Sequence, residues 1–512
     1  MKYILSIDSG STGIRAVLFD QNGQIIAREY EKVQQLTPEP GAMEFDPEAL
    51  WQALLSVSKK ILDNSTCDVK DIAALGICNQ RGTFVLWDRK TGEPVTNFIG
   101  WADVRAAKTC EKIIKHNFKW KFMKFVTKIA SVFHPMLRTA AKMRLNTDHS
   151  IVRLKWLLDS QPELRQRCKA REIAFSTIDS WFIYKLTGGK VHATDYSNAV
   201  VTNLYNPYWR RWNGIFMFIF DIAPIIFPDV KDTNGDFGVT DPGAFHNVSI
   251  PIRAAVGDQM AALFGDCCFE PGSVKGSFGS GAFVDMNIGQ KSIATKRGLL
   301  PMVAWCLNGK LTNMVEGSIA TAGLLVDWLD RGLGLADSPE VLNELAAQCD
   351  DAEGVVFIPT SAGIQYPYFI PEARGCIFGL SLATRKCHVA RAVLEGIALA
   401  LTEIIDTMRR DIKKPITTIK VDGGVSRSDI LLHCLADFAN VTVERSQKSE
   451  MAATGVAYFA GLGVGIWKNL DELKQLEKKS TTFEPKITAE ARKNKIKLWK
   501  KSITAMLSAY AP

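Results

Sequence analysis

The stretch Ile7-Asp8-Ser9-Gly10-Ser11-Thr12-Gly13 joins one apolar strand to a second apolar run that ends at Phe19. A turn of small residues between two strands places backbone N–H groups and hydroxyls where they can meet phosphate oxygens, and glycine permits close backbone approach. Asp8 ends the first strand, and its carboxylate suits Mg²⁺, which prefers carboxylate and phosphate oxygens. The stretch therefore predicts a phosphate-binding hairpin.

A second turn of this kind, Ser277-Phe278-Gly279-Ser280-Gly281, is again followed by an apolar run. Either turn alone is as readily an ordinary hairpin. Because the two turns are similar and stand far apart in the chain, together they favour two related lobes that hold one nucleotide.

Length and composition are those of a soluble globular protein with more than one domain. The chain has 512 residues, too many for a single core, with 47% apolar and 23% charged residues. A net charge of +8 is mild over this length, so we expect no nucleic-acid partner. The 11 cysteines show neither CxxC pairs nor metal-ligand spacing, which favours free thiols. We expect a cytoplasmic protein without a signal peptide.

Strands and helices alternate along the chain, which favours an α/β fold with partly parallel sheets. We expect the strand 250–256 to enter the second lobe, which gives domains at residues 1–248 and 249–512. The small-residue helix 451–463 is expected to pack closely on another helix or on a ligand. Further helices are predicted at 47–62, 151–158, 178–186, 318–329 and 389–408.

One segment differs in composition from the alternating strands and helices. Residues 111–128 contain six lysines interleaved with Phe118, Trp120, Phe122 and Phe125. Near an anionic membrane each lysine contributes about 1 kcal/mol, so peripheral membrane contact through Lys112 to Lys128 is one interpretation. The favoured alternative is a solvated helix whose aromatic residues pack on its own lobe. The apolar run 215–220 is too short to span a bilayer and predicts core or a partner contact.

Several motifs occur in a characteristic order across nearly the whole chain. They are Ile7-Asp8-Ser9-Gly10-Ser11-Thr12 with Arg15, Met43-Glu44-Phe45-Asp46-Pro47, Asn79-Gln80-Arg81, Thr177-Ile178-Asp179-Ser180-Trp181, Gly257-Asp258-Gln259, Phe278-Gly279-Ser280-Gly281, Arg374-Gly375-Cys376-Ile377-Phe378-Gly379-Leu380 and Val421-Asp422-Gly423-Gly424. In this order the chain resembles the FGGY carbohydrate kinases and, within that family, the glycerol kinases, with most similarity to a divergent animal paralogue.

The resemblance implies two actin-like, ribonuclease-H-like ATPase domains with a cleft between them. It implies transfer of the ATP γ-phosphoryl group to a primary hydroxyl of a polyol with Mg²⁺, most simply glycerol to glycerol 3-phosphate. ATP and Mg²⁺ are the expected cofactors, and glycerol or a similar polyol is the expected partner. A homodimer is left open.

The resemblance also assigns residues to roles. Asp258 follows an apolar strand, where a carboxylate can reach a hydroxyl as general base. Arg81 and Gln259 would orient the polyol, Trp101 would form an apolar wall, and Gly82 would lie in the same pocket. Asp8 would hold the metal. The residues expected at the nucleotide are Ser11, Thr12, Gly13, Arg15, Ser280, Gly323, Asp327, Gly424 and Ser428.

The departures from the family bear mainly on the acceptor. Gly82 stands where glycerol kinases usually place a glutamate that binds a glycerol hydroxyl. Loss of a hydrogen bond to a charged group costs roughly 1.5–3 kcal/mol, or about ten- to a hundredfold in affinity. The family's substrate tyrosine has no counterpart, and Asp148 or His149 lies nearest in sequence. In the C-terminal half, Ile370 replaces an acid, and on the nucleotide side Asp327 and Ser428 replace a glutamine and an asparagine.

Two alternatives therefore stay open beside glycerol phosphorylation. One is a kinase for a pentulose or another polyol, in which the acceptor fills the space beside Gly82. The other is a regulator with weak catalysis that binds a membrane or a partner through residues 112–128.

Overall fold

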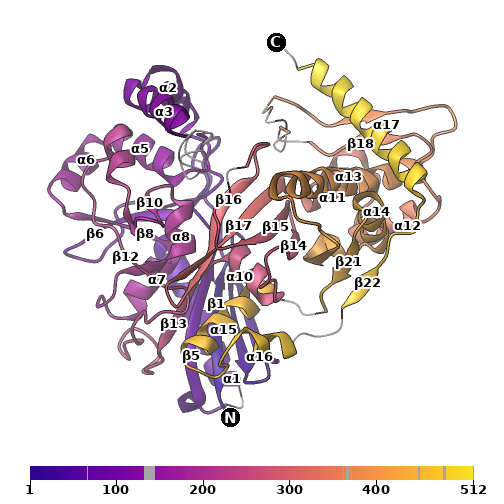
Figure 1. The fold of residues 1–512 in the computed structure, drawn as a ribbon. Coiled ribbons are helices and arrows are strands. Elements are labelled where there is room, and N and C mark those ends of the chain that lie inside the picture. The colour runs from indigo at the N-terminus through magenta and orange to yellow at the C-terminus, as the bar shows by residue number, and fades with distance from the viewer. Residues whose placement is uncertain are drawn as a thin grey trace.

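The computed structural model describes the chain apart from residues 66, 132–144, 294, 361–362, 365–367, 369, 371, 448–449, 477–479 and 511–512, and apart from the side chains of residues 327 and 330. Figure 1 shows the N-terminal elements gathered on one side and most C-terminal elements on the other, with the hairpin of β16 (Leu300–Leu307) and β17 (Lys310–Ile319) between them. The predicted site residue Asp327 lies outside the described side chains.

The first sheet has five strands in the order β13-β5-β1-β2-β3. β1 pairs antiparallel with β2, and β2 with β3, whereas β5 and β13 run parallel to β1. Long buried apolar runs explain these strands, since β1 and β5 are covered on both faces. The strands are β1 (Tyr3–Ser9), β2 (Gly13–Asp20), β3 (Ile25–Lys32), β5 (Ile72–Asn79) and β13 (Ile252–Gly257).

The second large sheet has seven strands in the order β16-β17-β15-β14-β20-β21-β22. β14 pairs antiparallel with β15, β15 with β17 and β17 with β16, whereas β20 and β21 run parallel to β14. The strands are β14 (Val274–Phe278), β15 (Ala282–Gly289), β16 (Leu300–Leu307), β17 (Lys310–Ile319), β20 (Thr418–Asp422), β21 (Thr442–Arg445) and β22 (Thr481–Phe483).

The two sheets share one topology. The order β17-β15-β14-β20-β21 repeats β3-β2-β1-β5-β13, with the same pattern of antiparallel and parallel pairs. The two small-residue turns, after β1 and after β14, occupy equivalent places in this repeat. The expected pair of actin-like, ribonuclease-H-like α/β domains is confirmed.

Two predictions about local structure are wrong. The strand predicted at 250–256 does not enter the second lobe, because β13 pairs in parallel with β5 and forms the edge of the first sheet. The helix predicted from Ser318 begins later, since β17 continues to Ile319 and α11 spans Gly323–Leu333. The domain limits 1–248 and 249–512 stay a prediction.

Helices α10 (Asp258–Gly265) and α15 (Met451–Gly463) pack closely against each other beside the first sheet. A Cβ at Gly455 would lie 1.7 Å from the Ala261 carbonyl oxygen, so only glycine permits this approach. α15 also covers β1, β5 and β13, and Figure 1 shows this C-terminal segment beside them. Of the two kinds of packing considered for the small-residue helix, the structure shows helix packing.

The remaining elements complete both lobes. In α1 the Asp46 side chain accepts the Glu48 N–H at 2.8 Å and caps the helix. The further strands are β4 (Glu44–Phe45), β6 (Phe84–Asp88), β7 (Phe98–Ile99), β8 (Ile173–Thr177), β9 (Ala193–Asp195), β10 (Tyr205–Asn206), β11 (Arg211–Trp212), β12 (Asp229–Lys231), β18 (Val356–Ile358) and β19 (Cys376–Phe378). The further helices are α1 (Pro47–Asn64), α2 (Ala107–His116), α3 (Phe118–Ala130), α5 (Ser150–Ser160), α6 (Pro162–Lys169), α7 (Ile178–Leu186), α8 (Tyr196–Val201), α9 (Gly214–Ile219), α12 (Pro339–Ala346), α13 (Lys386–Ile412), α14 (Asp429–Ala439), α16 (Leu470–Gln475) and α17 (Ala489–Ser508), with short 3₁₀ turns at 69–71 and 424–427.

All 11 cysteines are free thiols, as the sequence predicted. Within the part of the chain that the structure describes, no helix is both long enough and apolar enough to cross a membrane.

Candidate active site

Three charged residues meet at one edge of the first sheet. Asp8 lies near the end of β1, Arg81 follows β5, and Asp258 follows β13. Because β1, β5 and β13 are parallel neighbours, their carboxyl ends lie side by side. Ligands bind at this edge of open α/β sheets. The topology thus brings together side chains that are up to 250 positions apart (8 to 258) in the chain.

Arg81 connects the two sheets. Its Nε lies 3.4 Å from Asp258 Oδ1, and its Nη2 donates to Glu316 Oε2 on β17 at 2.7 Å. A Cβ at Gly257 would lie 2.7 Å from Arg81 Cγ, so glycine leaves room for the Arg81 side chain. Arg81 and Asp258, which the sequence placed in one polyol site, do lie together.

Asp258 is the first residue of α10, and its Oδ1 accepts the backbone N–H of Gln259 at 2.8 Å. Burial raises the pKa of Asp258 to about 6, although the Arg81 guanidinium opposes this shift. A carboxylate with this pKa is ionised at neutral pH yet basic enough to accept a proton from an alcohol under transfer. Asp258 is therefore fit for the predicted role of general base.

Gln259 lies beside this base at the start of α10. Its side-chain oxygen Oε1 is buried and has no hydrogen-bond partner among the described residues. A buried acceptor without a partner costs free energy unless a donor reaches it. A hydroxyl of a bound polyol would satisfy this atom, which fits the orienting role predicted for Gln259.

The first small-residue turn is held in place from two sides. Gly10 N–H donates to the Gly13 carbonyl at 3.0 Å, which closes the turn. Ser11 Oγ donates to Gln80 Oε1 at 3.0 Å, and Trp101 Nε1 lies 3.3 Å from Ser11 Oγ. Ser11 and Trp101, predicted to bind phosphate and polyol respectively, are thus neighbours.

The residues that follow in this turn belong to the hairpin β1–β2. Tyr30 donates its hydroxyl to the Thr12 carbonyl at 2.9 Å, and a Cβ at Gly13 would lie 2.3 Å from the Glu31 carbonyl oxygen. Arg15 bridges Asp8 (3.4 Å) and Glu450 (3.3 Å). The backbone contacts of Thr12 and Gly13 therefore fix the shape of the first turn. Arg15 adds a positive charge beside it.

The surroundings of Asp8 fit a divalent cation. Its carboxylate is buried, and this desolvation raises its pKa although Arg15 opposes the shift. The field of Asp8 also raises the pKa of Asp258, so the two carboxylates lie within electrostatic range. Mg²⁺ is typically held by one or two carboxylates together with substrate phosphates. The donor set therefore suits the predicted metal.

The second turn is built from close backbone contacts. Gly279 N–H donates to the Gly281 carbonyl at 2.9 Å, and the Ser280 carbonyl accepts the N–H of Ala322 at 2.9 Å. A Cβ at Gly323 would lie 2.7 Å from the Gly279 carbonyl oxygen. Gly323 is thus required for α11 to begin against the turn at Ser280.

Two adjacent glycines after β20 differ in their surroundings. Gly423 has φ +94°, and a Cβ there would lie 2.3 Å from the Phe278 carbonyl oxygen. At Gly424 a Cβ would meet nothing within 4 Å. Gly423 is therefore fixed by packing on the second turn, whereas Gly424 leaves open space beside it.

The last predicted nucleotide residue has a structural partner. Ser428 Oγ accepts the Leu431 N–H at 3.1 Å at the start of α14 and donates to Asn343 Oδ1 on α12. This hydroxyl is a helix cap, so the structure gives Ser428 a role in holding α12 against α14.

Gly82 adopts φ +72°, a left-handed backbone that glycine enters without strain. Its carbonyl accepts Ser150 Oγ at 2.8 Å and Arg153 Nη2 at 2.9 Å. The same Nη2 donates to the Asp148 carbonyl at 2.9 Å, so Arg153 ties Asp148 to Gly82. Burial lowers the pKa of His149 to about 4, so its ring is neutral at neutral pH.

Sequence reasoning missed a buried row of charges across the second sheet. Asp285 faces Lys275 on β14 and Glu316 on β17 in the strand register. Burial and the Glu316 carboxylate raise the pKa of Asp285 well above its usual range. Lys275 Nζ donates to Asp422 Oδ1 at 2.6 Å. The row links Arg81, through Glu316, to the loop before Gly423, and only the strand register could have revealed it.

A second cluster also escaped prediction. Sγ of Cys349, Sγ of Cys387 and a ring nitrogen of His388 lie within 4.8 Å of one another. Arg385 Nη2 lies 3.4 Å from His388 Nε2, and the positive charge of Arg391 also reaches Cys349. The cluster lies after α12 and at the start of α13, not at the carboxyl ends of β1, β5 and β13, so we assign it no role in the reaction.

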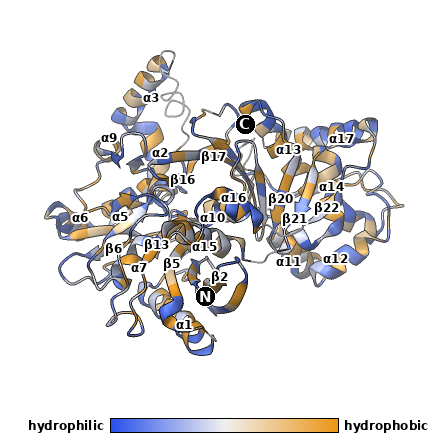
Figure 2. Ribbon diagram, turned by 60° about the horizontal axis from the view of Figure 1, so that its bottom comes forward, coloured by the Kyte–Doolittle hydropathy of each residue, from blue (hydrophilic) through white to orange (hydrophobic). Residues whose placement is uncertain are grey.

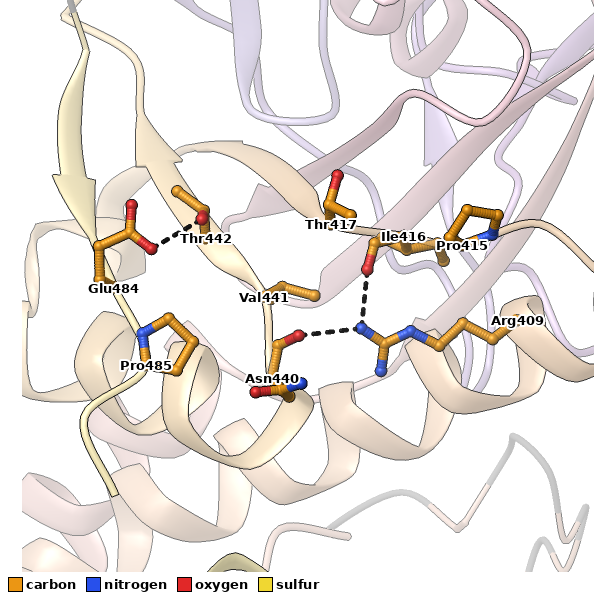
Figure 3. A pocket seen from close by; sticks show the side chains of 9 residues that line it. All are labelled: Arg409, Pro415, Ile416, Thr417, Asn440, Val441, Thr442, Glu484 and Pro485. Atoms are coloured by element: carbon orange, nitrogen blue, oxygen red, sulfur yellow. Dashed lines mark hydrogen bonds between the residues drawn. The ribbon is translucent and has the colours of Figure 1, made fainter. Parts of the chain in front are cut away.

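A hollow of about 470 Å³, shown close up in Figure 3, is lined by residues around the starts of β20 and β21. Thr417 and Thr442 stand where β20 and β21 begin, whereas the predicted nucleotide residues follow the other end of β20. Arg409 donates to the carbonyls of Ile416 (2.8 Å) and Asn440 (3.2 Å). The Arg409 guanidinium in this hollow is thus already hydrogen-bonded to backbone carbonyls of the protein.

Comparisons with known proteins show the family to which the chain belongs. Residues 3–265 match the N-terminal domain of the FGGY family of carbohydrate kinases, and residues 274–464 match its C-terminal domain. The chain is 36% identical to glycerol kinase 2 of Thermotoga maritima over 99% of both chains. It is 38% identical to the glycerol kinase of Carboxydothermus hydrogenoformans over 98% of both.

Solved structures give the same picture. The crystal structure of Plasmodium falciparum glycerol kinase with ADP matches with a TM-score of 0.88 and 29% identity, over 99% of this chain and 98% of that chain. A xylulose kinase from Lactobacillus acidophilus matches with a TM-score of 0.84 at 20% identity, over 100% of this chain and 99% of that one, and this likeness supports the fold alone.

Proposed function

We propose, since the chain belongs to the FGGY family of carbohydrate kinases, that it phosphorylates glycerol with ATP to give glycerol 3-phosphate and ADP. The observation that carries this proposal is the meeting of Arg81 and Asp258 at 3.4 Å beside the first small-residue turn. A guanidinium and a carboxylate on one side of a phosphate-binding turn can hold an alcohol and accept its proton.

In the reaction, a primary hydroxyl oxygen of glycerol forms a bond to the γ-phosphorus as the bond to the β,γ-bridging oxygen of ATP breaks. Asp258 accepts the hydroxyl proton, and ADP leaves. The transition state of phosphoryl transfer is loose, so catalysis depends mainly on positioning and on stabilising charge. Arg81 and Gln259 orient the polyol, and Trp101 covers its carbon chain.

The two turns hold the nucleotide in this account. Backbone N–H groups and hydroxyls at Ser11, Thr12 and Gly13 meet phosphate oxygens with Arg15 nearby, and Ser280 does so from the second sheet. Gly323 and Gly424 border the nucleotide. Asp8 would hold Mg²⁺, which when bound neutralises phosphate charge.

We expect the Asp148 carboxylate to bind the glycerol hydroxyl that other glycerol kinases bind with a glutamate at the position of Gly82. Its exposed carboxylate accepts Asn146 Nδ2 at 2.9 Å and lies in the electrostatic range of Glu316, which binds Arg81. We expect Asp148→Asn to raise the KM for glycerol about tenfold. Asp159→Asn, at the far end of α5, is the matched control and should leave that KM unchanged. An unchanged KM in the Asp148 variant would remove this assignment.

The test of the function is an acceptor screen with Mg-ATP. We expect glycerol-dependent ADP release in equal amount with glycerol 3-phosphate, identified by ³¹P NMR, and a lower kcat/KM for xylulose and other pentuloses. Faster turnover of a pentulose would favour the alternative acceptor. ATP hydrolysis without phosphorylation of any acceptor would contradict the proposal.

A further inference from the structure

Helix α3 is attached to the N-terminal lobe by one narrow face. Trp120 is buried and packs edge-on against Phe220 with ring centroids 5.7 Å apart. Asn117 caps the helix by accepting the Trp120 N–H at 2.9 Å, and its Nδ2 donates to the Ile219 carbonyl at 3.0 Å. These contacts fix the orientation of α3 on α9.

The opposite face of α3 carries a second apolar stripe. The exposed fractions are 78% for Phe118, 57% for Phe122, 62% for Phe125 and 52% for Ile129. At about 100° per residue, these four positions fall within about 60° of one another around the helix. The expectation that the aromatic residues pack on their own lobe is therefore right for Trp120 alone.

The stripe continues onto the neighbouring helix, where Phe218 is 65% exposed. Lys119 Nζ lies 3.7 Å from the centre of the Phe218 ring, which joins the two helices. Figures 1 and 2 show α3 at an outer end of the N-terminal lobe. We call Phe118, Phe122, Phe125, Ile129 and Phe218 the aromatic stripe. Exposed apolar patches of this kind mark interaction sites.

Positive charge flanks the aromatic stripe on both sides. Around the helix, Lys119 lies on one side of it, and Lys121 and Lys128 lie on the other, all three being exposed. The sequence has no aspartate or glutamate between Glu111 and Asp148, so no acidic side chain of this segment offsets these lysines. The apolar stripe with cationic borders is the pattern of a helix that lies in a membrane interface.

We propose that the aromatic stripe docks the protein onto an anionic lipid bilayer, with α3 lying in the plane of the interface. The phenylalanine rings enter the headgroup region while the three lysines contact anionic headgroups. This docking goes beyond the proposed kinase reaction and needs neither ATP nor glycerol.

The test is co-sedimentation of the full chain with vesicles, in the absence of substrates. We expect binding to phosphatidylcholine vesicles with 30% phosphatidylserine (a chosen composition) and at least tenfold weaker binding to phosphatidylcholine alone. Replacing three lysines in K119Q/K121Q/K128Q should weaken binding to the anionic vesicles about a hundredfold. F118S/F122S/F125S should weaken it more than tenfold.

A matched control comes from α17, a helix that is also rich in exposed lysines but has no such stripe. K493Q/K497Q/K500Q removes the same charge and should leave vesicle binding within about threefold of wild type. All variants should keep the wild-type melting temperature, since the changed side chains are exposed.

Three results would overturn the proposal. The first is no binding of the wild-type chain to anionic vesicles. The second is an equal loss of binding in the α17 variant, which would show a response to net charge alone. The third is a concentration-dependent dimer that F118S/F122S/F125S abolishes without any vesicle binding, since a second copy of the chain would then cover the stripe.

Discussion

The two large sheets repeat one topology but carry different chemistry at equivalent edges. The first sheet ends its parallel strands in charged side chains, Asp8, Arg81 and Asp258, which meet in one cluster. In the second sheet, two of the matching strands, β14 and β20, are followed directly by glycines, Gly279 and Gly423. In the proposed function, one fold repeat therefore supplies the reacting groups, and the other supplies close backbone approach for the nucleotide.

This difference predicts how substitutions on the two sides should behave. Substitutions in the first sheet's cluster should affect the chemical step or the binding of the alcohol. Substitutions of the second sheet's glycines should affect nucleotide binding or stability.

The largest effect is expected for Asp258→Asn. General-base catalysis contributes about 10²–10⁴-fold, so kcat should fall by roughly a thousandfold. The Kd for ATP should stay within about threefold of wild type, because Asp258 belongs to the cluster of the first sheet and not to the nucleotide-side glycines of the second sheet. Rapid-quench measurement of glycerol 3-phosphate and calorimetry with ATP check both parts. A kcat within tenfold of wild type would remove Asp258 from the chemical step.

Arg81→Gln should raise the KM for glycerol about ten- to a hundredfold, because it removes a charged hydrogen-bond donor. It also leaves Glu316 buried without its partner, which costs about 3–5 kcal/mol of stability. The double variant Arg81→Gln/Glu316→Gln separates these effects. Thermal unfolding should recover in the double variant while the KM stays high; a KM that recovers too would make Arg81 a purely structural residue.

The two adjacent glycines on the nucleotide side should respond differently. Gly423→Ala places a Cβ 2.3 Å from the Phe278 carbonyl at φ +94°, so we expect a loss of about 1–3 kcal/mol in unfolding free energy. Gly424→Ala has open space, so its stability should match wild type while the KM for ATP rises several-fold. Denaturant titration and kinetics measure the two. Equal loss of stability in both variants would contradict the assignment of Gly424 to the nucleotide.

The smallest effect is expected at Gly82. An alanine there keeps φ +72° and meets its nearest neighbours, Arg153 and Val201, at 3.5 Å, an ordinary contact. The strain of a left-handed alanine costs about 1–2 kcal/mol, seen as a lower denaturation midpoint. The KM for glycerol should change less than twofold, since Gly82 offers no side chain to the acceptor. A large rise in KM would place the acceptor directly against this backbone.

Many strands and both small-residue turns could be predicted from the sequence, because local residue patterns determine them. Apolar runs that end in Asp8 or Asp258 and turns rich in glycine determine strands and hairpins by themselves. The sheet to which β13 belongs could not be predicted, since chain order does not say which strand it pairs with. Glu316 was missed for the same reason, as its contact with Arg81 joins positions 235 apart in sequence.

The basic segment shows a different limit. A pattern of lysines and aromatic residues predicts an amphipathic helix, but Trp120 and Phe122 look alike in sequence although one is buried and the other exposed. Only the packing of α3 on α9 separates them.

The measurement that tests the central claim most directly is the pH dependence of kcat/KM for glycerol in the wild type and in Arg81→Gln. Asp258 accepts a proton only when ionised, so the wild-type rate should fall about tenfold per pH unit below its pKa of about 6. Since the Arg81 guanidinium favours the ionised form, its removal should raise this pKa and move the acid limb to higher pH. An acid limb that is absent, or that stays in place when Arg81 is removed, would contradict the claim that these two side chains serve one alcohol.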